Sequence, residues 1–147
     1  MDIKSTLMHS FEEILDKMAF LFFEEGQPDT PPEQFDYISH VDFKGVINGT
    51  LHLFFTHATG EELARNLIGI RDDDELYKGT VEDAVCEFTN MIMGRTMTEL
   101  NPDERFELTV PVIVQEPSWP GDGDTSVRVD GMLEDEPCRI VMHYRER

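Results

Sequence analysis

Apolar residues recur at helical spacing over about the first two dozen positions of the chain. Charged residues such as Glu12, Glu13 and Lys17 lie between them, so this pattern predicts an amphipathic helix that ends near Gly26. Residues 26–34, which read GQPDTPPEQ, are polar and rich in proline and predict a loop. The apolar positions of the predicted helix are Ile3, Leu7, Phe11, Ile14, Met18 and Phe22.

Between Phe35 and Thr56 the pattern changes to β-branched and aromatic residues with a period of two, which predicts two strands. Two places could form the turn between them. One is the Lys44-Gly45 region, and the other is Asn48-Gly49, a dipeptide that is typical of tight hairpin turns. The pattern by itself leaves both turns open.

Two helices are predicted next. Residues 59–69, TGEELARNLIG, have Thr59 as a candidate N-cap and a glycine at the end, which is typical of a short helix. A longer helix is predicted to begin at Thr80, with Asp83 as a weak capping partner, and to run to about Asn101-Pro102.

Three segments with strand-like composition follow: residues 106–115, 125–133 and 138–145. The predicted order of elements is therefore helix, two strands, two helices and three strands. This order indicates an α+β fold in which helices pack on a mainly antiparallel sheet. The length fits a single domain over residues 1–147.

The long helix has one face whose composition calls for explanation. Its core-facing stripe comprises Val81, Ala84, Val85, Phe88, Met91 and Ile92, and its far side carries Asp83, Glu87, Asn90 and Gly94. An exposed glycine inside a helix costs about 1 kcal/mol relative to alanine, so we expect a partner to approach closely there. Met97 is expected to be semi-exposed on the same side, where methionine suits an adaptable binding surface. The alternative is a solvated polar face with an incidental glycine.

Composition narrows the possible partners. The formal net charge is −19, from 31 acidic and 12 basic residues, which argues against broad contact with nucleic acid or anionic lipid. No apolar run is long enough to span a bilayer, so we expect a cytoplasmic protein. Cys86 and Cys138 are expected to be free thiols, and the five histidines have no metal-ligand spacing. No metal site of its own is expected.

A four-residue motif spans the long helix and the segment after it: Asp83, Glu87, Asn90 and, about twenty residues later, Pro111. It resembles the motif of the CheX members of the CheC/CheX/FliY family, phosphatases that remove the phosphoryl group from the response regulator CheY. Residues 87–94, EFTNMIMG, match the family form Glu-x-x-Asn-Met-x-x-Gly, which occurs once here, as in the CheX type. Residues 45–69 also resemble the family's strand pair and short helix, and this likeness favours the turn at Lys44-Gly45.

The resemblance implies a function in chemotaxis signalling. Asn90 would orient the hydrolytic water and Glu87 would pair with a lysine of a phosphorylated CheY-like receiver domain, while Asp83, Gly94 and Met97 would contact that partner. The response regulator would supply Mg²⁺, so the chain would need no cofactor of its own. The family likeness also implies a CheC/CheX-like fold and a homodimer formed along sheet edges. Two alternatives stay open: a non-catalytic module that binds a receiver or flagellar component, and a regulator that acts outside chemotaxis.

Overall fold

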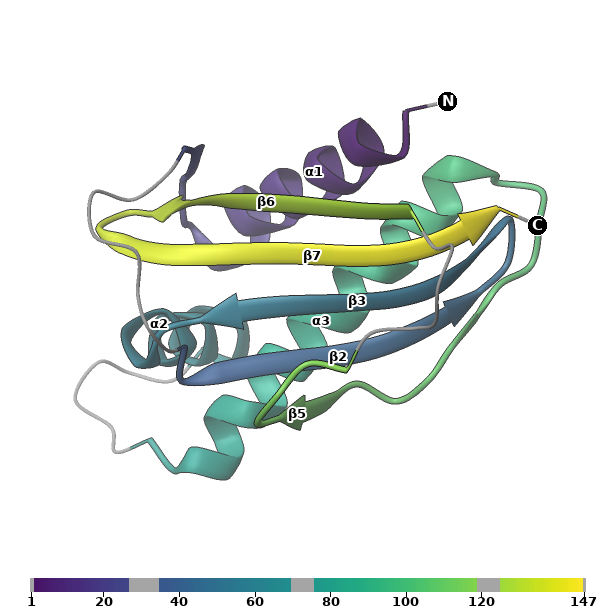
Figure 1. The fold of residues 1–147 in the computed structure, drawn as a ribbon. Helices are drawn as coiled ribbons and strands as arrows, with labels where there is room; N and C mark the ends of the chain where they lie inside the picture. Colours follow the sequence, from purple (N-terminus) through teal and green to yellow (C-terminus); the bar gives the residue numbers. More distant parts are fainter. Residues whose placement is uncertain (1, 27–34, 70–75, 119–124, 147) are drawn as a thin grey trace.

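A computed structural model describes residues 2–26, 35–69, 76–118 and 125–146, and this part of the chain forms a layer of helices against one antiparallel sheet (Figure 1). The predicted α+β fold is confirmed. The helices are α1 (Ile3–Ile14), α2 (His57–Ile68) and α3 (Lys78–Leu100), and a π-helical turn, Leu15–Ala19, continues α1. The strands are β1 (Phe23–Glu25), β2 (Tyr37–Lys44), β3 (Ile47–Phe55), β4 (Glu107–Leu108), β5 (Val112–Val114), β6 (Thr125–Leu133) and β7 (Glu136–Glu146).

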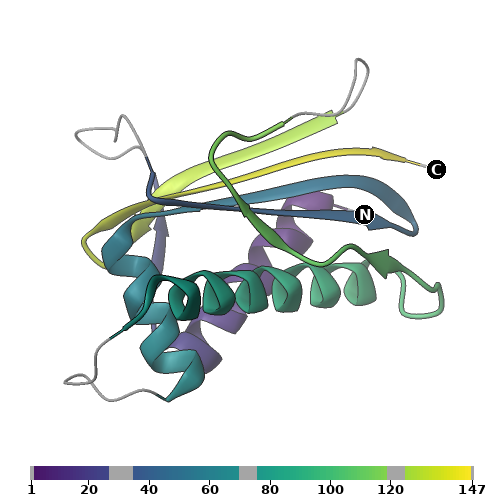
Figure 2. The same cartoon turned by 90° about the horizontal axis from the view of Figure 1, so that it is seen from below.

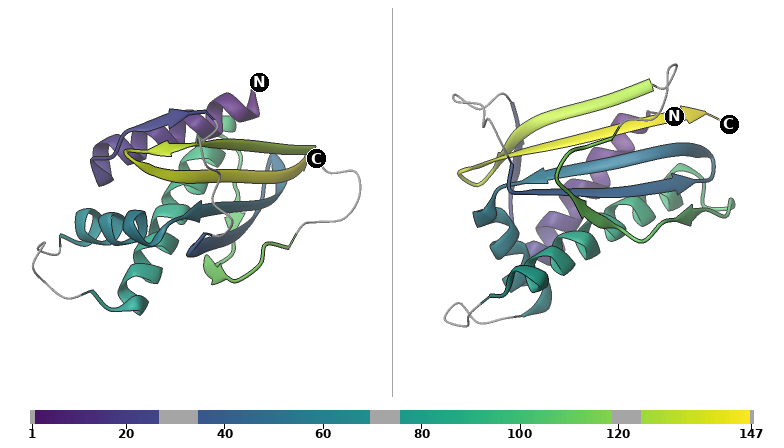
Figure 3. Two further views of the ribbon diagram at one scale, coloured as in Figure 1. Left: turned by 60° about the vertical axis from the view of Figure 1, so that its left-hand side comes forward. Right: turned by 60° about the horizontal axis from the view of Figure 1, so that its bottom comes forward.

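The strands lie in the order β1-β6-β7-β3-β2-β4, and β5 pairs with β2 beside β4. Every paired strand is antiparallel to its neighbour. All three helices cover the same face of the sheet, as the view from below shows (Figure 2). The long helix α3 contacts both α1 and α2 and runs beneath β2 (Figure 3). The edge strands β4 and β5 also contact α3, which places this edge of the sheet beside the long helix.

Alternate residues of each strand point to opposite faces of the sheet, and the two faces differ. On the helix side, the ring of Phe88 lies between those of Phe11 and Phe55, with both centroid distances at 5.9 Å. Fully burying such a side chain contributes about 1.5–3 kcal/mol, so this aromatic group ties α1, α3 and β3 together. The helix-free face carries a smaller buried cluster, Ile38, Phe54 and Val141.

The N-terminal helix is shorter than its apolar spacing predicts. The helical segment ends at Ala19, not near Gly26, because Phe20 takes a left-handed backbone conformation with φ of 57°. The chain then reverses and forms β1, in which Phe23 pairs with Leu133 of β6. As a result Phe22, assigned by its spacing to the buried stripe, is 69% exposed. The predicted loop at 26–34 lies, beyond Gly26, outside the described residues.

The turn between β2 and β3 follows Lys44, which confirms the Lys44-Gly45 alternative. Gly49 lies within β3, where the backbone of β7 comes so close that an added Cβ would stand 1.9 Å from the carbonyl oxygen of His143. A glycine is therefore required there by the close approach of a neighbouring strand.

Three predicted boundaries were wrong. Thr56 caps α2 by accepting a hydrogen bond from the Thr59 backbone N–H, so Thr59 lies inside the helix. The helix α3 begins at Lys78, two residues before Thr80, and has no side-chain cap. The predicted strand at 106–115 is two short strands, β4 and β5, while the predicted stop of α2 at Gly69 is confirmed.

Candidate functional site

The polar face of α3, defined as Asp83, Glu87, Asn90 and Gly94, lies away from the core. Asp83 and Glu87 are exposed, and Asn90 and Gly94 are half-buried. The opposite side of the same helix is closed against the sheet and α1 by residues that are each at most 2% exposed: Val81, Ala84, Val85, Phe88 and Ile92. The helix periodicity thus presents a carboxylate and a carboxamide one turn apart on the outer surface.

The side chains of Glu87 and Asn90 keep their hydrogen-bonding capacity for another molecule. Within the described part of the chain, neither forms a hydrogen bond or an ion pair with another residue. A carboxylate offers only acceptors, whereas a carboxamide offers two donors and an acceptor. The pair can therefore bind a cation at Glu87 and orient a small polar molecule at Asn90.

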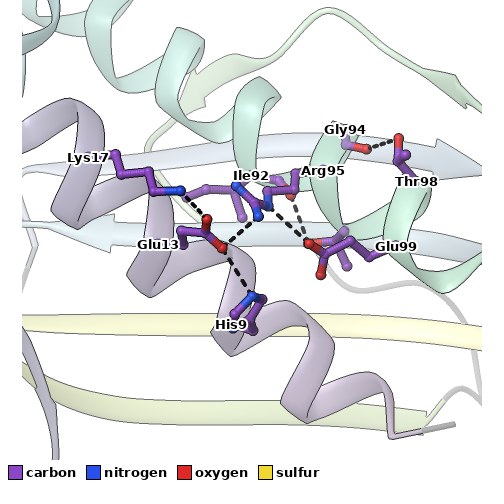
Figure 4. A network of polar contacts seen from close by, with 9 residues as sticks. His9, Glu13, Lys17, Ile92, Gly94, Arg95, Thr98 and Glu99 are labelled. Atoms are coloured by element: carbon purple, nitrogen blue, oxygen red, sulfur yellow. Dashed lines mark hydrogen bonds and ion pairs between the residues drawn. The ribbon is translucent and has the colours of Figure 1, made fainter.

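Gly94 is not required by the chain's own packing. An added Cβ would meet only the Leu108 side chain, at 3.9 Å, which is ordinary van der Waals contact. The backbone here is regular helix, and the Thr98 hydroxyl donates to the Gly94 carbonyl at 2.9 Å (Figure 4). The fold has room for a methyl group at this position, so the glycine costs about 1 kcal/mol in helix propensity without a packing reason.

Met97 does not belong to this face. It is only 2% exposed, so the expectation of a semi-exposed binding residue is wrong. The turn after β2 folds over this part of α3, where an added Cβ on Gly45 would stand 2.6 Å from Met97 Cε and 3.0 Å from Phe106 Cβ. Met97 therefore packs under the β2–β3 turn and is closed off from a partner.

A buried polar contact holds α3 against β2 directly behind Asn90. Thr89 and Ser39 are both fully buried, and their hydroxyl oxygens are 2.7 Å apart. Thr89 donates its hydroxyl hydrogen to the Val85 carbonyl at 2.7 Å, so Ser39 must be the donor to Thr89. In an otherwise apolar interface, this chain of hydrogen bonds selects one rotation of the helix. The sequence analysis did not single out either hydroxyl, because their partnership spans fifty positions.

An ion-pair network joins α1 to α3 beside Gly94 (Figure 4). Arg95 donates from Nη2 to Glu13 Oε2 at 2.5 Å and from Nε to Glu99 Oε1 at 3.1 Å, and Lys17 also donates to Glu13. Hydrogen bonds from Lys17 and Arg95 lower the pKa of Glu13. Of the described residues, His9, Glu13 and Glu99 lie close enough to hold a metal ion. Arg95 pairs with both carboxylates and Lys17 pairs with Glu13, so two cations already compensate the two acidic groups and the cluster works as an interhelical ion-pair network.

The two cysteines are free thiols, as expected. Burial, followed by the charges of Asp83 and Glu82, raises the pKa of Cys86 to about 11. Burial also raises the pKa of Cys138 well above its usual range. Both side chains are therefore neutral thiols near pH 7, and Cys86 is a poor nucleophile despite its place beside Glu87.

The residues of the polar face of α3 do not line any of four hollows found in the described structure. The largest of the four, about 520 Å³, lies beside the β2–β3 hairpin and β4. Pro111, the last position of the motif, lies between β4 and β5 at the edge that contacts α3. Even α3, the longest helix of the described chain, lacks the apolar length needed to cross a membrane.

The described chain is an open antiparallel sheet with three helices on one face, and Glu-x-x-Asn lies on the outer side of its longest helix. Residues 37–122 match the sequence model of the family described as chemotaxis phosphatase CheX, and the chain belongs to this family. Comparison with curated proteins gave no match.

Solved structures of CheX proteins share the fold. The CheX of Desulfovibrio desulfuricans superposes with a TM-score of 0.78 at 19% identity, covering 99% of this chain and 100% of that one. The CheX of Vibrio vulnificus gives 0.77 at 19% identity, with 99% and 97% covered. The CheX of Borrelia burgdorferi, in a CheX–CheY–BeF₃–Mg²⁺ complex, gives 0.76 at 21% identity, with 99% of both chains covered.

Proposed function

We propose that this chain hydrolyses the aspartyl phosphate of a CheY-like receiver domain in bacterial chemotaxis signalling. The observation that carries the proposal is the pairing of Glu87 and Asn90 on the exposed face of α3, in a member of a family described as a chemotaxis phosphatase. The Borrelia relative, which is crystallised with CheY, supports the choice of partner.

Asn90 would act by orienting water. In the hydrolysis, a water oxygen attacks phosphorus in line, the bond between phosphorus and the aspartyl oxygen breaks, and the products are a free aspartate and inorganic phosphate. An aspartyl phosphate is already an activated acyl phosphate, so the main requirement is a water held in line. The carboxamide can accept from and donate to that water without acting as a base.

Glu87 would set the register of docking. Its carboxylate, one helical turn from Asn90, would pair with the lysine of the receiver's phosphorylation site. The phosphorylated aspartate and Mg²⁺ belong to the receiver, where the metal neutralises charge on the phosphoryl oxygens. Asp83 and Gly94 would border the contact, the first by charge and the second by leaving space for close approach.

The exposure of Asp83 and Glu87 on the outer side of α3 supports a macromolecular substrate. A receiver domain carries its phosphoryl group in a site of its own. Glu87 and Asn90 would complete that site from outside. Because receiver domains of chemotaxis are cytoplasmic, this function would also place the chain in the cytoplasm.

We also propose that the chain forms a homodimer. The described sheet ends at β1 on one side and at β4 and β5 on the other. Unpaired backbone groups at such edges are the means by which two copies could join into a continuous sheet.

The test is phosphate release from a phosphorylated receiver domain of the same organism. Wild type should accelerate release, Asn90→Ala and the isosteric Asn90→Asp should lose most of the acceleration, and both should still bind the receiver. Glu62→Ala, which removes an exposed glutamate from α2, is the surface control and should behave as wild type. Binding without any acceleration by wild type would replace this proposal with the non-catalytic receiver-binding module.

A further inference from the structure

The sheet edge beside the polar face of α3 carries an exposed valine. Val110 is 83% exposed, the highest value among the large hydrophobic side chains of the described chain, and Val112 is 48% exposed. A single exposed apolar residue is ordinary. Val110 differs from such a residue because it lies on the sheet edge beside α3 and because hydrogen bonds and a proline hold its backbone in place.

The pairing register places an extra residue in this edge. Leu108 pairs with Phe43, and Val112 pairs with His40. Between these two pairs, the chain advances three residues along β2, from 43 to 40, but four residues along the edge, from 108 to 112. The edge therefore has the residue count of a β-bulge, a feature that often re-aims side chains next to functional sites.

Leu108 pairs with Phe43, and the Thr109 N–H donates to the Asp42 carbonyl. By this count, Val110 and Pro111 are the two residues that fall opposite Val41. Val41 is fully buried in the core between sheet and helices, so its position belongs to the helix side of the sheet. Val112, opposite His40, occupies the alternate position on the helix-free side. By the register count, Val110 and Val112 fall on opposite faces of the sheet.

The bulge adjoins the polar face of α3. Leu108, at its start, lies within 3.9 Å of the place where a Cβ on Gly94 would stand, and both β4 and β5 contact α3. A molecule that covers Asn90 and Gly94 would extend over this edge of the sheet.

Val110 is held on a rigid base. The Thr109 backbone N–H donates to the Asp42 carbonyl at 3.0 Å, and the Thr109 hydroxyl accepts from the Asp42 backbone N–H at 2.9 Å. Pro111 restricts the preceding residue to extended conformations, and the ladder of β5 follows at once. An apolar side chain ordered in advance loses little conformational entropy when a partner covers it.

We propose that Val110 is an apolar anchor for the same receiver domain, gripping it at the sheet edge while Glu87 and Asn90 engage its phosphorylation site. This inference rests on the proposed function. The occupant follows from continuity, because the surface that covers Asn90 and Gly94 is the one that reaches the bulge. A second copy of the chain is the competing occupant of this edge, and a change of oligomeric state in Val110→Ser would overturn the anchor.

The test compares Val110→Ser with Val112→Ser, the same substitution two residues apart on opposite faces. Calorimetric titration with a receiver domain gives Kd, and phosphate release gives KM and kcat. We expect Val110→Ser to raise Kd and KM roughly tenfold with kcat unchanged, because a buried valine side chain is lost from the contact. Val112→Ser should match wild type. Urea unfolding of both variants would verify the fold.

Each outcome separates the anchor from the phosphatase. If the wild-type chain hydrolyses the aspartyl phosphate and Val110→Ser has the same Kd and KM as wild type, the anchor is overturned and the phosphatase proposal stands. Binding without turnover would overturn the phosphatase, while the Kd of the two variants would still decide the anchor. A wild-type chain that neither binds nor hydrolyses would overturn both. Equal losses in the two valine variants would also overturn the anchor, because they would mark a general effect of the edge.

Discussion

Replacing Gly94 with alanine should make the protein more stable and a worse phosphatase. The added methyl would meet only Leu108, at 3.9 Å, so the fold can accept it without strain. Glycine is less favourable than alanine in a helix interior by about 1 kcal/mol, and the variant should gain about that amount. With a urea slope of about 1–3 kcal/mol/M, the unfolding midpoint should rise by roughly 0.3–1 M.

The same methyl should impair docking. It would stand on the polar face, beside Asn90, where the receiver is expected to approach. Forcing an extra methyl into a packed contact costs about 1–3 kcal/mol, which corresponds to a rise in KM of roughly 5- to 150-fold. Phosphate release at varied receiver concentration would measure this, and kcat at saturation should change less than KM.

Gly79→Ala is the matched control. Gly79 is the other glycine of α3, it is exposed, and an added Cβ would meet nothing within 4 Å. It lies near the start of the helix, several turns from Gly94, so its substitution should leave KM unchanged. A Gly94→Ala variant that is stabilised but keeps the wild-type KM would refute the docking argument. A destabilised variant would refute the reading of Gly94 as free of packing demands.

Two further predictions concern stability. Thr89→Val should lower the free energy of unfolding by about 1–3 kcal/mol, because it leaves the Ser39 hydroxyl buried without its acceptor. Thr89→Ser keeps a hydroxyl and should retain most of the stability. If urea unfolding gives the same stability for both variants, the hydrogen-bond chain is contradicted. Burial, followed by the neighbouring His40 and His143, lowers the pKa of His52 from 6.5 to about 4. The folded state then binds fewer protons than the unfolded state, so the stability contributed by neutral His52 is present above about pH 6.5 and is lost as the pH falls from there towards 4. Urea unfolding at several pH values should show a shallower loss in His52→Gln between about pH 6.5 and 5, and an unaltered slope would contradict the shift.

The outer face of α3 could be predicted because helical periodicity alone decides which side chains share a face. Asp83, Glu87 and Asn90 needed no knowledge of the rest of the fold. The position of Met97 could not be predicted in this way, because its burial depends on the β2–β3 turn and on Phe106, which come together with α3 only in the tertiary structure. A helical wheel places a residue relative to its own helix and carries no information about what folds over that helix.

The first strand was missed for a different physical reason. The reversal after α1 occurs at Phe20, with φ of 57°, and a phenylalanine gives no sequence signal of a left-handed backbone. The apolar residues Phe22 and Phe23 then continue the spacing of the helix before them. Short edge strands are similarly faint: the division of residues 106–115 into β4 and β5 is set by the register against β2, which a local pattern does not contain.

The residues proposed for hydrolysis and the residue proposed as anchor lie on different elements, α3 and the β4–β5 edge. This arrangement bears on how such a domain could change partners over evolution. Edge strands tolerate substitution and insertion because few backbone contacts depend on them, whereas α3 is anchored on three sides by the sheet, α1 and α2. With the groups assigned to hydrolysis on the helix and the proposed anchor on the edge, a descendant could acquire another receiver by altering the bulge. Glu87, Asn90 and the core beneath them would be inherited unaltered.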